Sequence, residues 1–365
     1  MLNHLIREKY QLVIDAIEAI ESSDYRICLV RESDETIIGT ITDGDIRRHL
    51  LDGGKLTSKL EVIMNKNPLF TTPGMSKTEI IDLMTRRNVL VLPLLDSKRK
   101  LMKLVHLRDL QIENNIETKK NIFDAAVILA GGEGKRLAPL TNDIPKPMLL
   151  IGGAPILERI ISTLRDHGIQ KIYLSVNYLK EQIISHFESG EDFGVSIHYL
   201  EEKAKLGTAG SLSLLTNEAF ENILVINGDI YSNIKLDSLL EFHTKNKADL
   251  TVCGFMYDFR VPYGVISVKK GQILSIEEKP SFEFLCNAGI YAVSNKILNL
   301  VPRNIFFDMP ELINSCLREK LKVTAFPVYE NWNDIGSFED LSRVQSEYLK
   351  SQLIEKMKGT EKDAR

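Results

Sequence analysis

From residue 123 onward, short apolar runs alternate with amphipathic segments almost to the end of the chain. Runs typical of strands lie at 125–129, 171–176, 196–200, 223–226, 250–255, 265–268 and 288–293. Segments with the apolar period of a helix lie at 155–166, 179–187, 208–216, 236–245 and 309–319. This alternation predicts an α/β fold, with a mainly parallel sheet that carries helices on both faces.

Composition excludes several classes of protein. The chain has 365 residues, which suggests two or three domains, and 44% of them are hydrophobic. The net charge of −4 argues against a nucleic-acid partner, because binding to phosphate backbones needs a basic surface. The apolar runs are too short to span a bilayer. We therefore expect neither a nucleic acid nor a membrane as partner.

The N-terminus and the cysteines indicate the compartment. Charged residues at positions 7–9 lie where a signal peptide needs its apolar centre. The four cysteines show no C-x-x-C spacing, so we expect neither a disulfide framework nor a zinc site. Together these features predict a cytoplasmic protein.

The first third of the chain contains an internal repeat of 64 residues. Ser33 aligns with Ser97 and Asp45 with Asp109, and apolar positions follow the same offset. Each copy predicts a helix, a strand, a polar turn and a second strand that ends at a polar corner containing aspartate. Two copies of this size are expected to bury their apolar faces on each other.

The first copy contains GTITDGDIRR (Gly39–Arg48), which resembles the signature of a cystathionine β-synthase (CBS) motif. In that family a hydroxyl residue and an aspartate three positions later hold the ribose of an adenine nucleotide. The resemblance implies this role for Thr42 and Asp45, whereas in the second copy His106 replaces the hydroxyl and only Asp109 remains. Both residues of the first copy could instead simply cap the following helix, which leaves nucleotide sensing and a structural or dimerising role open.

These patterns divide the chain into parts. We expect a CBS pair at 1–115 (copies at about 1–60 and 61–115), a polar linker at 116–122, the α/β domain at 123–350 and a C-terminal tail at 351–365. Because CBS pairs commonly dock on one another, we also expect a homo-oligomer.

The strand at 125–129 leads into AGGEGKRLAPLTNDIPKPM (residues 130–148), which differs from both common glycine-rich phosphate motifs. A P-loop would need glycine at Leu129 and a hydroxyl at Arg136, and the dinucleotide fingerprint fails at Leu137. Strand-end glycines still let backbone N–H groups face an anion, and Lys135, Arg136 and the proline-bracketed Lys146 add positive charge. The loop predicts a triphosphate site, with a surface turn carrying solvated cations as the alternative.

Two carboxylates follow strand-like segments elsewhere in the chain. Asp229 ends VINGDI (residues 225–230), and Asp334 lies in WNDIG (residues 332–336). Two carboxylates at one sheet edge suit a magnesium ion between phosphates. Either aspartate alone could be an ordinary turn or cap residue.

With these motifs, the region from Phe123 to about Tyr348 resembles the sugar-1-phosphate nucleotidylyltransferases, also called nucleoside-diphosphate-sugar pyrophosphorylases. The resemblance implies their Rossmann-like, mainly parallel mixed sheet of the nucleotide-diphospho-sugar transferase type. It also implies a nucleoside triphosphate, a sugar 1-phosphate and Mg²⁺ as ligands. The family commonly has threonine at the position of Lys135, so the resemblance implies no role for this lysine.

The resemblance assigns roles residue by residue. Catalytic roles fall to Arg136, Lys146 and Lys279, and metal binding to Asp229 and Asp334. The nucleotide is expected to contact Leu129, Gly131, Gly132, Gly134, Gly207 and Thr208. The sugar is expected to contact Tyr263, Gly264, Glu278 and Asn287.

The chemistry expected is in-line attack by a sugar-phosphate oxygen on the α-phosphorus, with pyrophosphate leaving. Two anions must approach, so neutralisation and alignment are the main tasks and no protein nucleophile is required.

The substrates are predicted by analogy. LGTAGSL (residues 206–212) resembles the loop of guanylyltransferases and of some uridylyl- and cytidylyltransferases. A CBS pair joined to such a domain resembles glucosamine-1-phosphate guanylyltransferases of bacterial legionaminic acid synthesis, and also mannose- and heptose-1-phosphate guanylyltransferases. We expect GTP and glucosamine 1-phosphate.

Two other classes remain as rivals. An inactive CBS nucleotide sensor is disfavoured because the five expected charged site residues are all present; these are Arg136, Lys146, Asp229, Lys279 and Asp334. A nicotinamide-dependent oxidoreductase is disfavoured by the failed fingerprint at Leu137.

Overall fold

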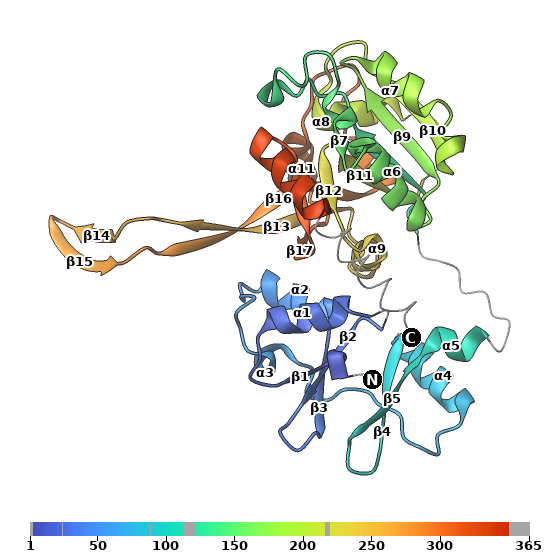
Figure 1. Cartoon of the computed structure of the whole chain (residues 1–365), viewed down its shortest axis with the longest axis vertical. Coiled ribbons are helices and arrows are strands. Elements are labelled where there is room, and N and C mark those ends of the chain that lie inside the picture. The colour runs from blue at the N-terminus through green and yellow to red at the C-terminus, as the bar shows by residue number, and fades with distance from the viewer. Residues whose placement is uncertain (1–2, 24, 88, 113–121, 216–219, 350–365) are drawn as a thin grey trace. The chain divides into compact units, whose positions relative to one another are not determined.

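The computed structural model describes residues 3–23, 25–87, 89–112, 122–215 and 220–349. The chain divides into two compact units, Met1–Lys120 and Asn121–Arg365, which we call the N-terminal and C-terminal units (Figure 1). Most of the predicted linker at 116–122 and the predicted tail at 351–365 lie outside the described residues. Within the described ranges, no helix is both long and apolar enough to span a bilayer.

The N-terminal unit contains two small sheets, one of three strands in the order β1-β2-β3 and one that pairs β4 with β5. Its elements are η1 (Asn3–Leu5), β1 (Ile6–Glu8), α1 (Val13–Glu21), β2 (Ile27–Arg31), β3 (Ile37–Thr42), α2 (Asp43–Leu51), α3 (Leu60–Ile63), α4 (Lys77–Arg86), β4 (Val91–Leu95), β5 (Leu101–His106) and α5 (Leu107–Ile112).

The repeat of 64 residues reappears in the strand pairing of the N-terminal unit. Ile27 pairs with Thr42 in the first hairpin, and Val91 pairs with His106 in the second. The offset continues through both antiparallel ladders, including a register shift near the far end of each. One buried cluster draws on both copies: Leu5, Ile27, Leu29, Ile37, Val91, Leu95 and Leu104. The two copies therefore fold alike and share a core.

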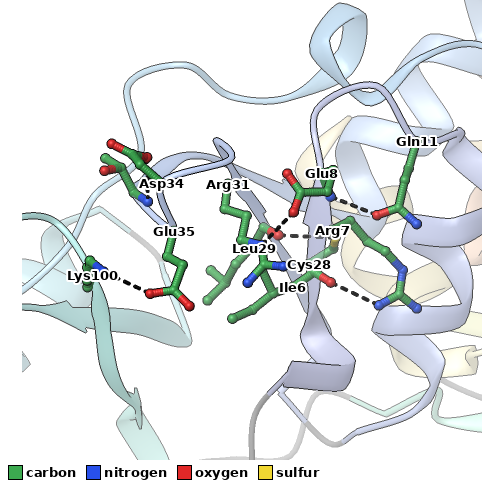
Figure 2. A network of polar contacts seen from close by, with 11 residues as sticks. Ile6, Arg7, Glu8, Gln11, Cys28, Leu29, Arg31, Asp34, Glu35 and Lys100 are labelled. Carbon is green, nitrogen blue, oxygen red and sulfur yellow. Dashed lines mark hydrogen bonds and ion pairs between the residues drawn. The ribbon is translucent and has the colours of Figure 1, made fainter.

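A polar contact also joins the two copies, as Figure 2 shows. Lys100, just before β5, forms an ion pair of 2.8 Å with Glu35 in the turn that precedes β3. Within the first copy, Arg31 of β2 forms an ion pair of 2.8 Å with Glu8 of β1. The Glu35–Lys100 pair links the two hairpin turns, but both side chains are exposed, so we expect it to add little stability.

The C-terminal unit contains the large sheet. Its strands are β6 (Ala125–Leu129), β7 (Leu150–Ile151), β8 (Ala154–Pro155), β9 (Lys171–Val176), β10 (Ser196–Glu201), β11 (Asn222–Asn227), β12 (Ile230–Ser232), β13 (Leu250–Arg260), β14 (Val265–Lys269), β15 (Gln272–Glu277), β16 (Ser281–Ser294), β17 (Val323–Val328) and β18 (Trp332–Asp334). Its helices are η2 (Lys135–Leu137), η3 (Lys146–Met148), α6 (Ile156–Asp166), α7 (Lys180–Phe187), η4 (Glu191–Phe193), α8 (Gly207–Gly210), η5 (Ser211–Leu214), α9 (Leu236–Lys245), α10 (Asn295–Leu298) and α11 (Met309–Arg318), followed by a helix at 338–349.

Seven strands form the main sheet, in the order β10-β9-β6-β11-β16-β13-β17. The pairs β10–β9, β9–β6, β6–β11 and β13–β17 are parallel, whereas β16 runs antiparallel to both of its neighbours. The predicted α/β fold with a mainly parallel mixed sheet is confirmed.

Alternate residues of β6, an inner strand of the main sheet, face two separate cores. Ala126 and Ile128 of β6 pack in a cluster with α6, α7 and α9, whereas Ala125 and Val127 pack in another with α8, α10 and α11. Because both faces of β6 are buried, all of its residues are apolar, which explains its continuous AAVIL sequence.

Two strands are much longer than the sequence patterns predict. The expected strands at 250–255 and 288–293 are the inner parts of β13, which continues to Arg260, and of β16, which begins at Ser281. Their outer parts pair as a two-stranded ribbon that carries the β14–β15 hairpin beyond it, and Figure 1 shows this ribbon projecting from the rest of the C-terminal unit. We call residues 255–286 the arm. The predicted ranges are shorter because a continuous apolar run marks only the buried inner part of each strand, whereas the outer parts are exposed.

His243 of α9 is a buried polar side chain that joins the helix to the sheet. Its Nδ1 lies 2.8 Å from Thr251 Oγ1, and its Nε2 lies 3.1 Å from both Asn222 Oδ1 and Ser294 Oγ. Burial lowers the pKa of His243, against a smaller opposing effect of Asp249. The folded chain therefore holds this imidazole neutral at a pH where an unfolded chain would protonate it.

We expect the free energy of unfolding to fall as the pH decreases below about 6.5, because the unfolded chain then binds a proton that His243 does not. This histidine can contribute a slope of up to about 1.4 kcal/mol per pH unit. In His243→Gln that contribution should vanish. Urea unfolding at a series of pH values, followed by circular dichroism, measures this pH dependence. The variant His198→Gln, which changes an exposed histidine, is the control. A wild-type slope in His243→Gln would contradict the assignment.

Candidate active site

The carboxyl ends of β6 and β11 lie side by side because the two strands are parallel neighbours. The loop at 130–134 follows β6, and Asp229 follows β11 after only one further residue. The amide of Gly228 donates to the carbonyl of Leu129 at 2.9 Å, so the two strand ends are tied together. The glycine loop and the first predicted metal ligand therefore share one edge of the sheet.

Asp334 reaches the same place through a short antiparallel pairing. β12 pairs with β18 so that Ile230 lies opposite Asp334, and the amide of Ile335 donates to the carbonyl of Asp229 at 3.1 Å. Two aspartates about a hundred residues apart in the chain thus become neighbours.

Lys146 lies between these two carboxylates. Its Nζ forms an ion pair with Asp229 Oδ2 and lies 3.9 Å from Asp334 Oδ1. The lysine is 8% exposed, although its ammonium carries a full charge. The three side chains form a compact charged group, which we call the Lys–Asp centre.

The Lys–Asp centre retains capacity for a cation. Asp229 Oδ1 and Asp334 Oδ1 are buried and have no hydrogen-bond partner. Burial, followed by the charge of Asp229, raises the pKa of Asp334, whereas Lys146 and Arg136 lower it. Buried oxygens without hydrogen-bond partners on adjacent carboxylates fit a hard divalent ion that takes its remaining ligands from water and phosphate. Among the described residues, no group of three or more histidine, cysteine or acidic side chains forms a complete metal cage.

Arg136 lies at the rim of this centre. A Cβ atom built on Gly336 would be 3.2 Å from Arg136 Nη2, so the guanidinium lies against the backbone two residues after Asp334. Lys135, in contrast, is exposed and forms an ion pair of 2.8 Å with Glu133. Of the two adjacent cations, only Arg136 is directed to the Lys–Asp centre.

Gly134 must be glycine for Lys146 to take this position. It has a φ of 65°, and a Cβ there would be 2.9 Å from Thr141 Cγ2 and 3.0 Å from Lys146 Cβ. Thr141 Oγ1 donates to the Gly134 carbonyl at 2.9 Å, and Tyr178 Oη donates to the Thr141 carbonyl at 3.2 Å. The loop is therefore folded back over the lysine.

Beside Gly131, the structure places two polar residues that sequence analysis missed. A Cβ on Gly131 would lie 3.2 Å from both Asn177 Cβ and Glu202 Oε1. Glu202 accepts hydrogen bonds from Ser175 Oγ at 2.6 Å and from the Leu206 amide at 2.9 Å. Asn177 and Glu202 directly follow β9 and β10. Their position at the carboxyl edge of a parallel sheet, where ligands bind, could have identified them from the sequence. Gly132 faces open space.

The predicted base-binding loop is held by Asp308. Gly207 has a φ of 80°, and a Cβ there would lie 2.7 Å from Asp308 Oδ1. The Thr208 amide and hydroxyl donate to the same oxygen at 2.8 and 3.1 Å, and Thr208 Oγ1 accepts from the Met309 amide at 2.8 Å. Thr208 thus helps to fix the start of α11, and Gly207 allows the close approach.

The predicted sugar-binding residues fall in two places. Asn287 lies at the body end of the arm, next to Ala288, whose carbonyl accepts a 2.9 Å hydrogen bond from Trp332 Nε1. The other three, Tyr263, Gly264 and Glu278, lie in the segments that connect the ribbon with the β14–β15 hairpin. Lys279, which was predicted to be catalytic and to contact the sugar phosphate, follows Glu278 in the same segment. A Cβ on Gly264 would be 2.9 Å from Glu278 Oε2, so the two segments are neighbours. Within one chain these two segments lie at the outer end of the ribbon, away from the Lys–Asp centre (Figure 1).

In the N-terminal unit, Thr42 and Asp45 contact each other. The Thr42 amide and hydroxyl donate to Asp45 Oδ2 at 2.8 and 2.7 Å, at the start of α2. Asp45 also forms an ion pair with Arg48. Asp109 is exposed in the first turn of α5. The capping geometry is present.

The glycine loop, the paired carboxylates and Lys146 lie together at the carboxyl edge of the parallel sheet. The chain belongs to the nucleotidyl transferase family, whose sequence model, described as "Nucleotidyl transferase", matches residues 125–351. A model described as "CBS domain" matches residues 60–112. Members of the nucleotidyl transferase family typically use a divalent metal ion.

Several known proteins are similar to the C-terminal unit. The bifunctional protein GlmU of Methanococcus aeolicus is 36% identical over 233 residues, which are 62% of this chain and 54% of GlmU. A mannose-1-phosphate guanyltransferase of Pichia angusta is 34% identical (61% and 64% covered), and a UTP–glucose-1-phosphate uridylyltransferase of Synechocystis is 32% identical (59% and 61% covered). The crystal structure of HddC from Yersinia pseudotuberculosis is 30% identical, with a TM-score of 0.49 over 62% of this chain and 100% of HddC. The chain spans about half to two thirds of the length of the curated relatives it matches.

Removal of the lysine should leave two neighbouring carboxylates without a counter-charge. For Lys146→Met we expect a loss of about 2 kcal/mol in the free energy of unfolding, below the usual cost for a fully buried pair because the carboxylates are partly exposed. Millimolar Mg²⁺ should restore more stability to this variant than to the wild type, because the ion would replace the missing positive charge.

Thermal and urea unfolding with and without Mg²⁺ measure both effects. Lys135→Met, which removes an exposed lysine, is the matched control and should stay within about 0.5 kcal/mol of the wild type. If Lys146→Met is as stable as this control, the lysine is not the counter-charge of the two aspartates.

Proposed function

We propose that this protein transfers a guanylyl group from GTP to a sugar 1-phosphate, with glucosamine 1-phosphate as the favoured acceptor, and releases pyrophosphate. The convergence of Lys146, Asp229 and Asp334 beside the loop at 130–134 carries the proposal. Membership of the nucleotidyl transferase family and the names of similar proteins support the reaction class.

The site suits a reaction in which two anions must meet. A phosphate oxygen of the sugar 1-phosphate forms a bond with the α-phosphorus, and the bond from that phosphorus to the β-phosphate oxygen breaks. The electron pair leaves with pyrophosphate. Backbone N–H groups after β6 and the Arg136 guanidinium would hold the triphosphate and offset the charge of the departing pyrophosphate. Lys146 lies close enough to the same loop to bind the reacting phosphates.

Asp229 and Asp334 would hold Mg²⁺, the divalent ion that we favour because carboxylate oxygens are hard ligands and one on each aspartate has no hydrogen-bond partner. When bound, this ion would supply further positive charge to the phosphate oxygens. Lys146 lies between the two carboxylates, so the same phosphate oxygens would meet its ammonium as well as the ion.

The choice of GTP rests on one loop and on the names of similar proteins. The loop at 206–212 resembles that of guanylyltransferases, and a relative from Pichia angusta is named a mannose-1-phosphate guanyltransferase. The Synechocystis relative is named a uridylyltransferase. Mannose and heptose 1-phosphates as acceptors, and UTP or CTP as donors, are therefore the alternatives to test.

The experiment is a matrix of purified protein and Mg²⁺ with ATP, GTP, CTP, UTP and dTTP, each against glucosamine, glucose, mannose and heptose 1-phosphates. Pyrophosphate release is the readout, and mass spectrometry identifies the nucleotide sugar. We expect the strongest signal with GTP and glucosamine 1-phosphate. Faster turnover with another pair would replace the proposed substrates, and no turnover with any pair would contradict the proposed reaction.

We expect Asp229→Asn to lower kcat by about a hundredfold or more while the fold survives, because the change removes one charge and keeps the shape of the side chain. Circular dichroism checks the fold, and initial rates over a range of Mg²⁺ concentrations check the mechanism. Asp192→Asn, an exposed change of the same kind, should behave as the wild type. A fully active Asp229→Asn variant with an unchanged Mg²⁺ dependence would remove Asp229 from the metal site.

For the N-terminal unit we propose that an adenine nucleotide binds near Thr42, Asp45 and Asp109 and changes activity or assembly. The match to the CBS domain at residues 60–112 covers Asp109. The repeat of 64 residues places Thr42 and Asp45 at the equivalent corner of the first copy. In the observed capping box Asp45 is already engaged, so a ribose would have to displace Thr42 from it. Titration with AMP and ATP tests the proposal, and unchanged activity and molecular mass would contradict it.

A further inference from the structure

The arm is a regular ladder that continues directly from the main sheet. Its strands pair without interruption from Gly254 opposite Asn287 to Arg260 opposite Ser281, and the one register shift lies inside the body at Val252. The stretch from Phe255 to Arg260 therefore extends roughly 17 Å. Figure 1 shows the β14–β15 hairpin at the far end, away from β12, which starts next to Asp229.

One face of this ribbon is aromatic. Directly paired residues share a face, and side chains alternate along each strand. Phe255 begins this face and stacks on Trp332, with ring centroids 3.8 Å apart. Farther out the same face carries two cross-strand aromatic pairs, Tyr257 with Phe284 and Phe259 with Phe282. The opposite face carries Asp258, Arg260, Glu283 and Ser281 among its residues.

The aromatic face is packed only at its inner end. Phe255 contacts the main core, whereas Tyr257, Phe259, Phe282 and Phe284 are 44–53% exposed. With side chains of about 200 Å², these four expose on the order of 400 Å² in a single chain. A soluble monomer rarely exposes an apolar patch of this size unless the patch binds something.

The hairpin at the end of the arm has the same character. Every residue of β14 and β15 is exposed, yet Ile266 pairs with Ile276 and Val268 with Ile273. These side chains are 49–67% exposed. If this hairpin and the aromatic face were each buried against another molecule, in two copies, they would form the apolar centre of a protein–protein interface. Such an interface typically buries about 1,600 Å² in total.

The arm also carries residues that the proposed reaction needs. Tyr263, Glu278 and Lys279 lie beyond the outermost pair of the ribbon, whereas the Lys–Asp centre lies on the body. The Val261 amide donates to the Pro280 carbonyl at 2.9 Å, which closes the ladder at this point. On its own, each chain therefore separates its phosphate site from the residues expected to bind the sugar phosphate.

We propose that the arm docks on a second copy of this chain and completes the partner copy's active site. In the resulting dimer each arm buries its aromatic face on the other copy, and its residues at 263–264 and 278–279 lie beside the other copy's Lys–Asp centre. The completion of the site rests on the proposed function, whereas the docking of the aromatic face does not.

The continuous ladder is the reason to choose a second copy over the chain's own body. To return to its own centre the arm would have to bend sharply, which would break backbone pairs between Gly254 and Arg260. Exchange between copies keeps every pair and gives a closed, twofold arrangement in which the same surfaces meet twice.

Mixed dimers test the exchange directly. Asp229→Asn inactivates the body and Lys279→Ala inactivates the arm, so we expect either variant alone to have little activity. The two variants are co-expressed with different affinity tags, and mixed dimers are purified over both affinity columns in turn. With exchanged arms, one of the two sites in each mixed dimer combines an intact body with an intact arm. We expect about half of the wild-type activity. If each arm served its own body, neither site would be complete, and activity at the level of the single variants would overturn the proposal.

Molecular mass tests the docking without any need for turnover. We expect Phe259→Ser with Phe282→Ser to halve the mass of the full-length assembly in light scattering. Asp258→Ser with Arg260→Ser, on the opposite face of the same ribbon, should keep the wild-type mass. Circular dichroism checks that both double variants are folded. A monomeric wild type, or an aromatic variant with unchanged mass, would overturn the docking.

The two experiments separate the failure of this proposal from the failure of the proposed function. An active wild type whose mixed dimers stay inactive would overturn arm exchange and leave the reaction intact. A wild type that is inactive with every substrate pair would contradict the reaction, while the mass of the aromatic variant would still support or overturn the docking.

Discussion

The contact between the Lys146 ammonium and the carboxylates of Asp229 and Asp334 organises the carboxyl edge of the main sheet. Like charges as close as these two aspartates would repel each other in a partly buried place without a cation beside them. The lysine supplies that cation, and it can do so only because Gly134 lets the preceding loop fold against its stem. The same three groups set the charge that an incoming polyphosphate and its metal ion would meet.

The sheet topology explains why these groups meet although they are distant in the sequence. Parallel β6 and β11 present their carboxyl ends together, and the short β12–β18 pairing adds Asp334 from near the end of the described chain. Antiparallel β16 enters at this edge, so that Asn287 and the arm start beside the site. The loop at 130–134, Asp229 and the arm therefore all extend from the same edge of the sheet.

Sequence patterns predicted most of this arrangement, and the exceptions have physical causes. Strands such as β6 and β9 are buried on both faces, and their apolar runs mark their ends closely. The outer parts of β13 and β16 alternate aromatic residues with mostly polar ones, so they contain no continuous apolar run that would mark them as strands. Glu202 and the partnership of Thr208 with Asp308 depend on contacts across loops, about which local sequence carries little information. The approach of Asp334 to Asp229 was predicted from their two motifs, whereas the β12–β18 pairing that produces it was not.

The uninterrupted ladder of the arm limits how its length can change in evolution. Insertion of two residues in each strand would lengthen the ribbon by one full repeat and keep every aromatic side chain on its present face. A single inserted residue would turn the outer part of one strand over, so that Phe282 or Phe259 would face the side of Asp258 and Arg260. We therefore expect related chains to differ in arm length by even steps, or else to carry a bulge that restores the face.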